Sequence, residues 1–61
     1  MMEVYTLHGK GHIEGQPVMV EDGVVRHAPQ ELAHWVGRSW TWCLEKIGAY
    51  SWSAEKADDG L

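Results

Sequence analysis

An Asp-Gly pair, Asp22 and Gly23, separates two valine-rich runs near the middle of this 61-residue chain. The first run, Pro-Val-Met-Val-Glu, covers residues 17–21, and the second opens with Val24 and Val25. A two-residue type I′ turn needs positive φ at both central positions, which glycine adopts freely and aspartate tolerates. The sequence therefore predicts an antiparallel hairpin with strands over residues 17–21 and 24–28.

A further strand is predicted over residues 2–8, where Val4, Tyr5 and Thr6 are types that fit a half-buried pleated surface. Three glycines then interrupt residues 8–16. This segment is either a bulged extension of the strand through His12 and Ile13 or a loop. Both alternatives stay open at this point.

A helix is predicted over residues 29–47. Pro29 suits the first helical position, Glu31 places negative charge in the first turn, and Gly48 is a natural terminator. Steps of 100° place apolar residues in one inward sector: Leu32, Val36, Trp40, Cys43 and Ile47. The opposite sector is expected to hold Glu31, His34, Gly37, Arg38, Thr41 and Glu45.

These elements predict a single α+β domain over residues 1–61, with a three-stranded antiparallel sheet (βββα) covered on one face by a C-terminal helix. Residues 49–52 either extend the helix or fold back over the sheet, and residues 53–61 are expected to fray. The uncovered sheet face or edge would be open to a second copy of the chain or to a target protein. A homodimer is therefore one expectation.

Cys43 is the only cysteine, so no disulfide can form within the chain. A thiol among tryptophans and aliphatic residues fits a reduced intracellular protein. The sequence shows neither a signal-peptide pattern nor an apolar run long enough to span a membrane. We expect a soluble protein in the cytoplasm, or in the host cytoplasm if a phage encodes it.

The charge is acidic, with nine acidic residues against five basic ones and a net charge of −4. Sequence-independent binding to nucleic acid needs lysines and arginines that displace counterions, so direct nucleic-acid binding is not expected. The acidity either steers the protein to a basic partner or only keeps a tryptophan-rich chain soluble.

No catalytic apparatus and no cofactor are predicted. His8 and His12 lie four residues apart, which on a strand is about 13 Å, too far to share one zinc ion. His27 and His34 are expected in solvent. The glycine-rich segment around Lys10 lacks the spacing of a phosphate-binding loop. Cys43 falls on the apolar helix face, where a nucleophile would have no base beside it.

Tryptophan is in excess, with four residues in a chain that has no phenylalanine. Trp35 and Trp42 are seven residues apart and would form a stripe along the edge of the helix, with Arg38 between them. Tryptophan and arginine are enriched at binding hot spots, although packing on the sheet is the alternative for either tryptophan. The predicted partner-binding residues are Trp35, Arg38, Trp42, Glu21, Asp22 and Glu45.

In size, acidity and lack of catalytic signature, the chain resembles the small phage and mobile-element proteins that inhibit host defences, anti-CRISPR proteins among them. That resemblance covers the whole chain and no motif. It implies a non-enzymatic inhibitor that masks a basic surface of a nucleic-acid-processing complex, with acidic residues placed where phosphate is expected: Glu3, Glu14, Glu21, Asp22, Glu45, Asp58 and Asp59. The alternatives are a self-associating accessory subunit and a small zinc-binding module.

Overall fold

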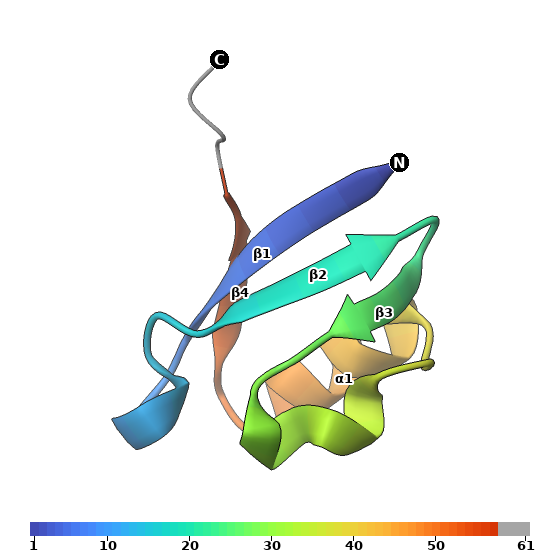
Figure 1. Ribbon diagram of the computed structural model, residues 1–61. Coiled ribbons are helices and arrows are strands. Elements are labelled where there is room, and N and C mark those ends of the chain that lie inside the picture. The colour runs from blue at the N-terminus through green and yellow to red at the C-terminus, as the bar shows by residue number, and fades with distance from the viewer. Residues whose placement is uncertain (58–61) are drawn as a thin grey trace.

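The computed structural model describes residues 1–57 and shows an α+β fold with one four-stranded antiparallel sheet (Figure 1). The strands are β1 (Met2–His8), β2 (Pro17–Glu21), β3 (Val24–His27) and β4 (Ser53–Lys56). Their order in the sheet is β3-β2-β1-β4. One α-helix, α1 (Trp40–Ala49), lies between β3 and β4 in the chain, and two short 3-10 helices, η1 (Gly11–Ile13) and η2 (Gln30–Trp35), complete the fold.

The predicted hairpin is present as β2 and β3. Asp22 and Gly23 have φ values of 53° and 81°, both in the left-handed region. This is the conformation that a two-residue type I′ turn demands. The predicted strands over residues 2–8 and 17–21 match β1 and β2, and β3 ends one residue earlier than expected, at His27.

The sheet has one strand more than predicted, because part of the supposed frayed tail is β4. This strand pairs with β1 in the register Thr6↔Glu55 and Leu7↔Ala54. Its sequence, Ser-Ala-Glu-Lys, has little β propensity of its own, so the pairing with β1 fixes its conformation. The prediction that residues 53–61 fray is wrong for residues 53–56, and residues 58–61 lie outside the described part of the chain.

The prediction of a single helix over residues 29–47 is also wrong. The chain forms η2, leaves the helical path after Trp35, and begins α1 only at Trp40. Gly37 has a φ of 90°, which a continuous right-handed helix does not allow. Ser39 then caps α1, since its hydroxyl oxygen accepts the Trp42 backbone N–H at 3.1 Å.

The segment between η2 and α1 covers the outer edge of β3. The Val25 N–H donates to the Arg38 carbonyl at 2.9 Å, and the Gly37 N–H donates to the Val25 carbonyl at 2.8 Å. Val24 and Ser39 form an antiparallel bridge. The break in the predicted helix thus gives β3 hydrogen-bond partners that a continuous helix would not supply.

The core lies between the helices and one face of the sheet. Its buried side chains are Leu7, Ile13, Val18, Val20, Val25, Leu32, Trp35, Trp40, Cys43 and Ile47. Four of the five residues in the predicted inward sector are among them, but Val36 is exposed because it follows the end of η2. Tyr5 stacks on Trp40 with ring centroids 4.6 Å apart.

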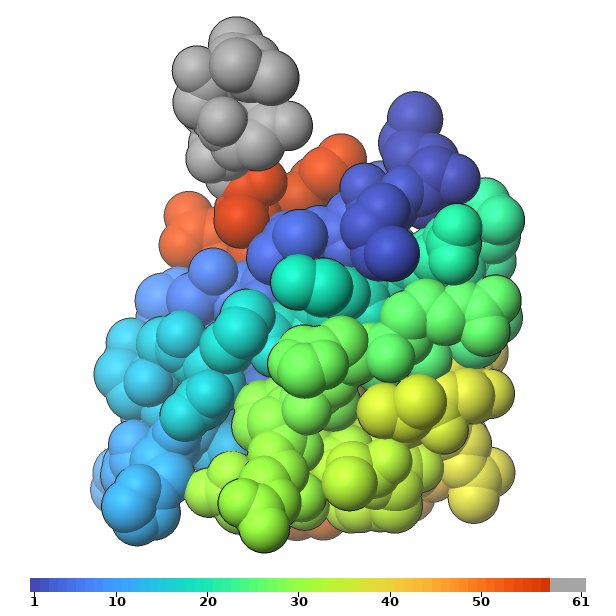
Figure 2. Space-filling view, in the orientation of Figure 1, coloured from blue at the N-terminus to red at the C-terminus, as the bar shows by residue number. Residues whose placement is uncertain are grey.

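Within residues 1–57, no helix covers the outer face of the sheet (Figure 1). Figure 2 shows side chains of β1, β2 and β3 lying side by side across the front, with the segment that leads into α1 below them. Val4 and Met19 are directly opposite each other in the sheet, and Met2 and Met19 are among the exposed apolar side chains. Arg26 and Glu21 form an ion pair at 3.4 Å.

Candidate functional site

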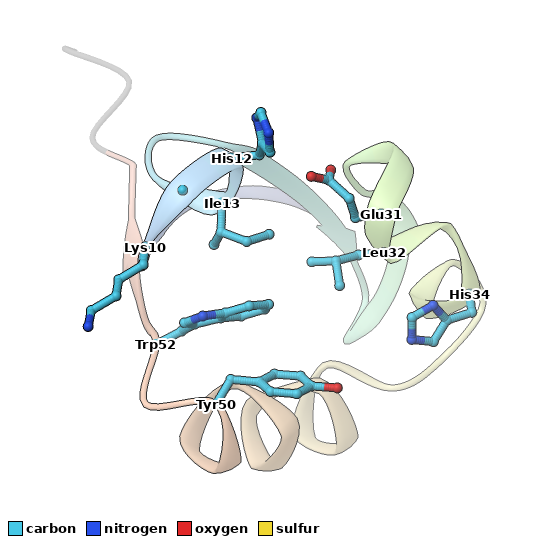
Figure 3. Close-up of a pocket in the computed structure, with 9 residues that line it drawn as sticks. Lys10, His12, Ile13, Glu31, Leu32, His34, Tyr50 and Trp52 are labelled. Atoms are coloured by element: carbon cyan, nitrogen blue, oxygen red, sulfur yellow. The ribbon is translucent and has the colours of Figure 1, made fainter.

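A pocket of about 450 Å³ brings together residues from distant parts of the chain (Figure 3). Three separate segments build it: the loop around η1, the helix η2, and the turn that joins α1 to β4. Its lining residues are Lys10, Gly11, His12, Ile13, Glu31, Leu32, His34, Tyr50 and Trp52. Its volume lies within the range of roughly 300–1,000 Å³ that small-ligand sites occupy.

The turn after α1 aims two aromatic side chains at the pocket. The Trp52 N–H donates to the Ile47 carbonyl at 3.0 Å, and the Ser51 N–H donates to the Gly48 carbonyl at 3.1 Å. Ser51 has a φ of 62°. These features form a Schellman motif, which ends the helix and reverses the chain. Tyr50 and Trp52 therefore lie on the same side of the turn.

Tyr50 and Trp52 stack, with ring centroids 4.5 Å apart and planes tilted by 36°. Figure 3 shows Tyr50 on one side of the Trp52 ring, and Ile13 and Leu32 on the other side. Ile13 and Leu32 belong to the buried core, whereas Tyr50 is 53% exposed. Trp52 thus packs against the core, and Tyr50 is the exposed aromatic side chain of the pocket.

The absence of a side chain at Gly9 leaves room for the Trp52 ring. A Cβ atom at residue 9 would lie 2.5 Å from Cδ1 of Trp52 and 2.9 Å from its Nε1. Only a glycine leaves room for the indole there, since carbon atoms in contact are about 3.5–4.0 Å apart. The glycine-rich segment is therefore a loop with a 3-10 turn rather than a bulged extension of β1.

His8 ties this loop to the sheet. Its Nδ1 lies 2.9 Å from the Glu14 carboxylate, and its Nε2 lies 3.3 Å from the Glu55 carboxylate. Hydrogen bonds with Glu14 and then Glu55 raise the pKa of His8 above 6.5. The same contact with His8 lowers the pKa of Glu14. Glu14 also accepts the Gly9 N–H at 3.2 Å, so one carboxylate holds both ends of the pocket loop.

The rim of the pocket carries opposite charges. Figure 3 shows His12 and Glu31 on one side of the opening, Lys10 at one end, and His34 at the other end beyond the Tyr50 hydroxyl. Within residues 1–57, neither Lys10 nor Glu31 forms an ion pair. Apolar walls with a polar rim suit the recognition of a ligand that has one apolar body and a hydrogen-bonding edge.

The predicted tryptophan stripe does not form. Trp35 is fully buried in the core, because η2 ends beside it and the chain turns away before α1. Trp42 is half-buried on α1, with the Arg38 guanidinium carbon 4.6 Å and the Lys46 Nζ 5.0 Å from its ring centroid. The structure thus keeps Arg38 and Trp42 together, adds Lys46, and excludes Trp35 from the surface.

The remaining predicted partner residues lie on two different elements. Glu21 and Asp22 are at the β2–β3 turn, where Asp22 binds the N-terminal ammonium at 3.0 Å. Glu45 is exposed on α1. Lys56 pairs with Glu3 at 3.2 Å, so cations offset much of the negative charge expected to imitate phosphate. Asp58 and Asp59 lie outside the described residues.

The histidines do not converge. His12 and His34 are at the pocket rim, His27 ends β3, and His8 pairs with two glutamates. Residues 1–57 contain no group of three or more His, Cys, Asp or Glu side chains able to hold a metal ion. Cys43 is buried, and burial raises the pKa of its thiol, which keeps it in the unreactive protonated form.

Across the described residues, no helix is long and apolar enough to cross a membrane. Comparisons of the chain with protein-family models, with curated proteins and with solved structures give no match. The pocket itself was not predicted. Trp52 was visible as part of the tryptophan excess, but its place depends on a turn and a strand pairing that join distant segments.

Proposed function

We propose that this chain is a non-catalytic protein-binding domain that docks its partner at the Tyr50–Trp52 pocket. The observation that carries the proposal is a surface pocket in which the exposed Tyr50 ring stacks on Trp52 at the edge of the core. Tryptophan and tyrosine are enriched at binding hot spots, which lie in well-packed pockets. A side chain projecting from a partner would bury the exposed part of Tyr50.

The pocket is prepared for binding without rearrangement of the backbone. The Schellman motif fixes the turn, Gly9 accommodates the indole, and His8 links the loop to β4. A surface that is already ordered loses little conformational entropy when it binds. Occupying a partner's surface in this way requires no chemistry, so it suits an inhibitor or modulator of a larger complex, the anti-defence role included.

Self-association is the second candidate, and the outer face of the sheet favours it. Met2 and Met19 are 50% and 38% exposed there, and no element of the described residues covers them. In a homodimer this face would be buried against its copy. Sedimentation of the purified protein at several concentrations distinguishes a monomer from such a dimer.

Affinity purification with three variants tests the docking proposal. Tyr50→Ala removes an exposed ring from the pocket, and Leu44→Ala is its matched control, an exposed apolar side chain of α1 outside the pocket. Trp42→Ala tests the surface with Arg38 and Lys46. A hot spot worth about 2 kcal/mol corresponds to roughly a 30-fold loss of affinity.

We expect wild type and Leu44→Ala to retain the same partner equally, and we expect Tyr50→Ala to lose it. Heteronuclear NMR spectra verify that each variant is folded. Retention by Tyr50→Ala with loss in Trp42→Ala would move the docking site to the Trp42 surface and contradict the proposal.

A further inference from the structure

The sheet has two edge strands, and only one of them is closed. On β3, residues 37–39 bond both the N–H and the carbonyl of Val25. The strand at the other end of the sheet is β4, since the order is β3-β2-β1-β4 (Figure 1). Within residues 1–57, no segment pairs with the outer side of β4. The two ends of the sheet thus differ in whether they can accept another strand.

The register of β4 with β1 identifies the backbone groups that face outward. The Ala57 N–H donates to the Val4 carbonyl at 2.8 Å, and these two residues lie opposite each other when the β1–β4 register is continued. In an antiparallel pair, successive residues alternate between bonding toward the partner strand and pointing away from it. Glu55 therefore bonds toward β1, as Ala57 does, whereas Ala54 and Lys56 direct their N–H and carbonyl groups away from the sheet.

These outward groups are one N–H and one carbonyl on each of two residues, at the spacing of an extended strand. None of the turn, loop and side-chain hydrogen bonds within residues 1–57 involves Ala54 or Lys56. Edge lysines commonly protect a sheet from further pairing, but the Lys56 Nζ lies 3.2 Å from the Glu3 carboxylate on β1. An extended backbone is the ligand that pairs with all four groups at once.

A second copy of the chain matches this edge poorly. The two-fold register that uses all four groups pairs each Ala54 with Lys56 of the other copy and sets the two Glu55 side chains face to face. Centring the pair on Lys56 opposes two ammonium groups instead, and like charges directly opposite each other are destabilising. Centring it on Ala54 leaves Lys56 opposite Trp52, whose N–H is already donated to the Ile47 carbonyl. Each of these registers loses hydrogen bonds or meets repulsion.

The outer sheet face beside this edge carries negative charge. Glu14 and Glu55 share a single imidazole, that of His8, and the Glu55 side chain is 77% exposed. A strand added antiparallel to β4 would place the residue opposite Glu55 on that same face of the sheet. Opposite charges at directly facing positions stabilise a strand pair, so a cation is favoured there.

We propose that β4 binds an extended segment of a partner protein by strand addition, with its backbone on Ala54 and Lys56 and a lysine or arginine opposite Glu55. The main-chain hydrogen bonds supply affinity, and the charge opposite Glu55 supplies selection. Neither Ala54 nor Lys56 lines the Tyr50 pocket, so the edge is a second surface whose role is independent of docking there.

NMR titration of the ¹⁵N-labelled full chain with short peptides tests the proposal. The probe is acetyl-Thr-Val-Lys-Val-Thr-amide, whose two valines would pair with Ala54 and Lys56 and whose lysine would face Glu55. One comparison peptide carries glutamate in place of lysine, and another has N-methylated valines, which cannot donate. The Val25 amide is an internal control, because its N–H is already bonded to the Arg38 carbonyl.

Two variants at one position separate the backbone from the side chain. Lys56→Pro removes an outward N–H, which an edge strand tolerates because no bond to β1 is lost. Lys56→Ala is its matched control, since it loses the same ion pair with Glu3 but keeps the N–H. Heteronuclear spectra verify that both variants are folded, and the N-methylated peptide tests the same hydrogen bonds with the chain unaltered.

We expect the lysine peptide to shift the Ala54 and Lys56 amide signals saturably and to slow their hydrogen exchange, with Val25 unchanged. The glutamate substitution and Lys56→Pro should each weaken binding at least five-fold. A factor of five is about 1 kcal/mol, the contribution of one hydrogen bond. The N-methylated peptide should not bind, and Lys56→Ala should bind the lysine peptide as wild type does.

Equal binding of the glutamate or the N-methylated peptide, or equal affinity of Lys56→Pro and Lys56→Ala, would overturn the inference. Amide signals of Ala54 and Lys56 that no peptide moves would overturn it too. Signals that move with protein concentration in the absence of peptide would assign the edge to a second copy and contradict the proposal. Docking at the pocket is judged separately, by partner capture with Tyr50→Ala.

Discussion

Gly9→Ala tests how tightly the wall of the pocket is packed. Residue 9 has an ordinary negative φ, since the positive-φ glycines are 11, 15, 23 and 37. Without a clash, Gly→Ala at such a position stabilises a protein by about 0.4–1 kcal/mol through the unfolded chain. The new Cβ would instead meet the Trp52 ring at 2.5 Å. Overpacking of that kind costs about 1–3 kcal/mol.

The magnitude is measurable in a chain of this size. At about 0.05–0.15 kcal/mol per residue, 61 residues give a free energy of unfolding of about 3–9 kcal/mol. Urea denaturation followed by far-UV circular dichroism should show Gly9→Ala less stable than wild type. In a Trp52→Ala background the same change should become neutral or stabilising, because the ring that it meets is absent.

Gly48→Ala is the matched control. Gly48 lies within α1, and no atom comes within 4 Å of a Cβ built there. The substitution should stabilise the chain by about 0.5–1 kcal/mol. A Gly9→Ala variant that gains stability as Gly48→Ala does would refute the close approach between Gly9 and Trp52.

Three further changes test the elements that position the pocket. Ser51→Gly should raise the free energy of unfolding by about 1 kcal/mol, because φ is 62° there and glycine adopts that conformation without strain. Ser39→Ala should lower it by about 1 kcal/mol by removing the N-cap of α1, as thermal and urea denaturation would both report. The pKa of His8 is raised above 6.5, so its stabilising contribution is complete below pH 6.5 and is lost as the pH rises through the folded-state value. The pKa of Glu14 is lowered from 4.5, so its contribution is present above pH 4.5 and is lost on acidification. Urea titrations at a series of pH values should therefore show stability declining above pH 6.5 in wild type and a flatter profile in His8→Gln, whereas parallel profiles would rule out the His8 link to Glu14 and Glu55.

The elements that could be predicted are those whose signal is local. Asp22 and Gly23 define their turn by their own conformational preferences, and the buried Val18 and Val20 alternate with exposed residues as a half-buried strand requires. The fold class and a helix packed on one sheet face followed from the same patterns. These features needed no information about distant parts of the chain.

The helix boundaries failed because periodicity does not detect a break in the backbone. Apolar residues continue at three-and-four spacing across Gly37, so Trp35 and Trp42 seemed to share one helix. Most of the predicted inward residues are buried all the same, since η2 and α1 pack on the same core. The prediction was wrong about the placement of Trp35 relative to Trp42, so the predicted stripe does not form.

The pocket and β4 could not be predicted from the sequence for a related reason. Ala54 is the only apolar residue in β4, so its conformation comes from pairing with β1 across more than forty residues of chain. Tyr50 and Trp52 reach the pocket only once that pairing and the Schellman turn are in place. Contacts of this kind depend on the assembled fold and leave no periodic signal.

Hydroxyl-radical footprinting of the free and partner-bound protein maps the docking surface most directly. Tyr50 reports on the pocket, and Met19 reports on the open sheet face, since both are exposed in the free chain. We expect oxidation of Tyr50 to fall strongly in the complex while oxidation of Met19 is unchanged. Protection of Met19 with Tyr50 still oxidised at its free rate would place the partner on the sheet and contradict docking at the pocket.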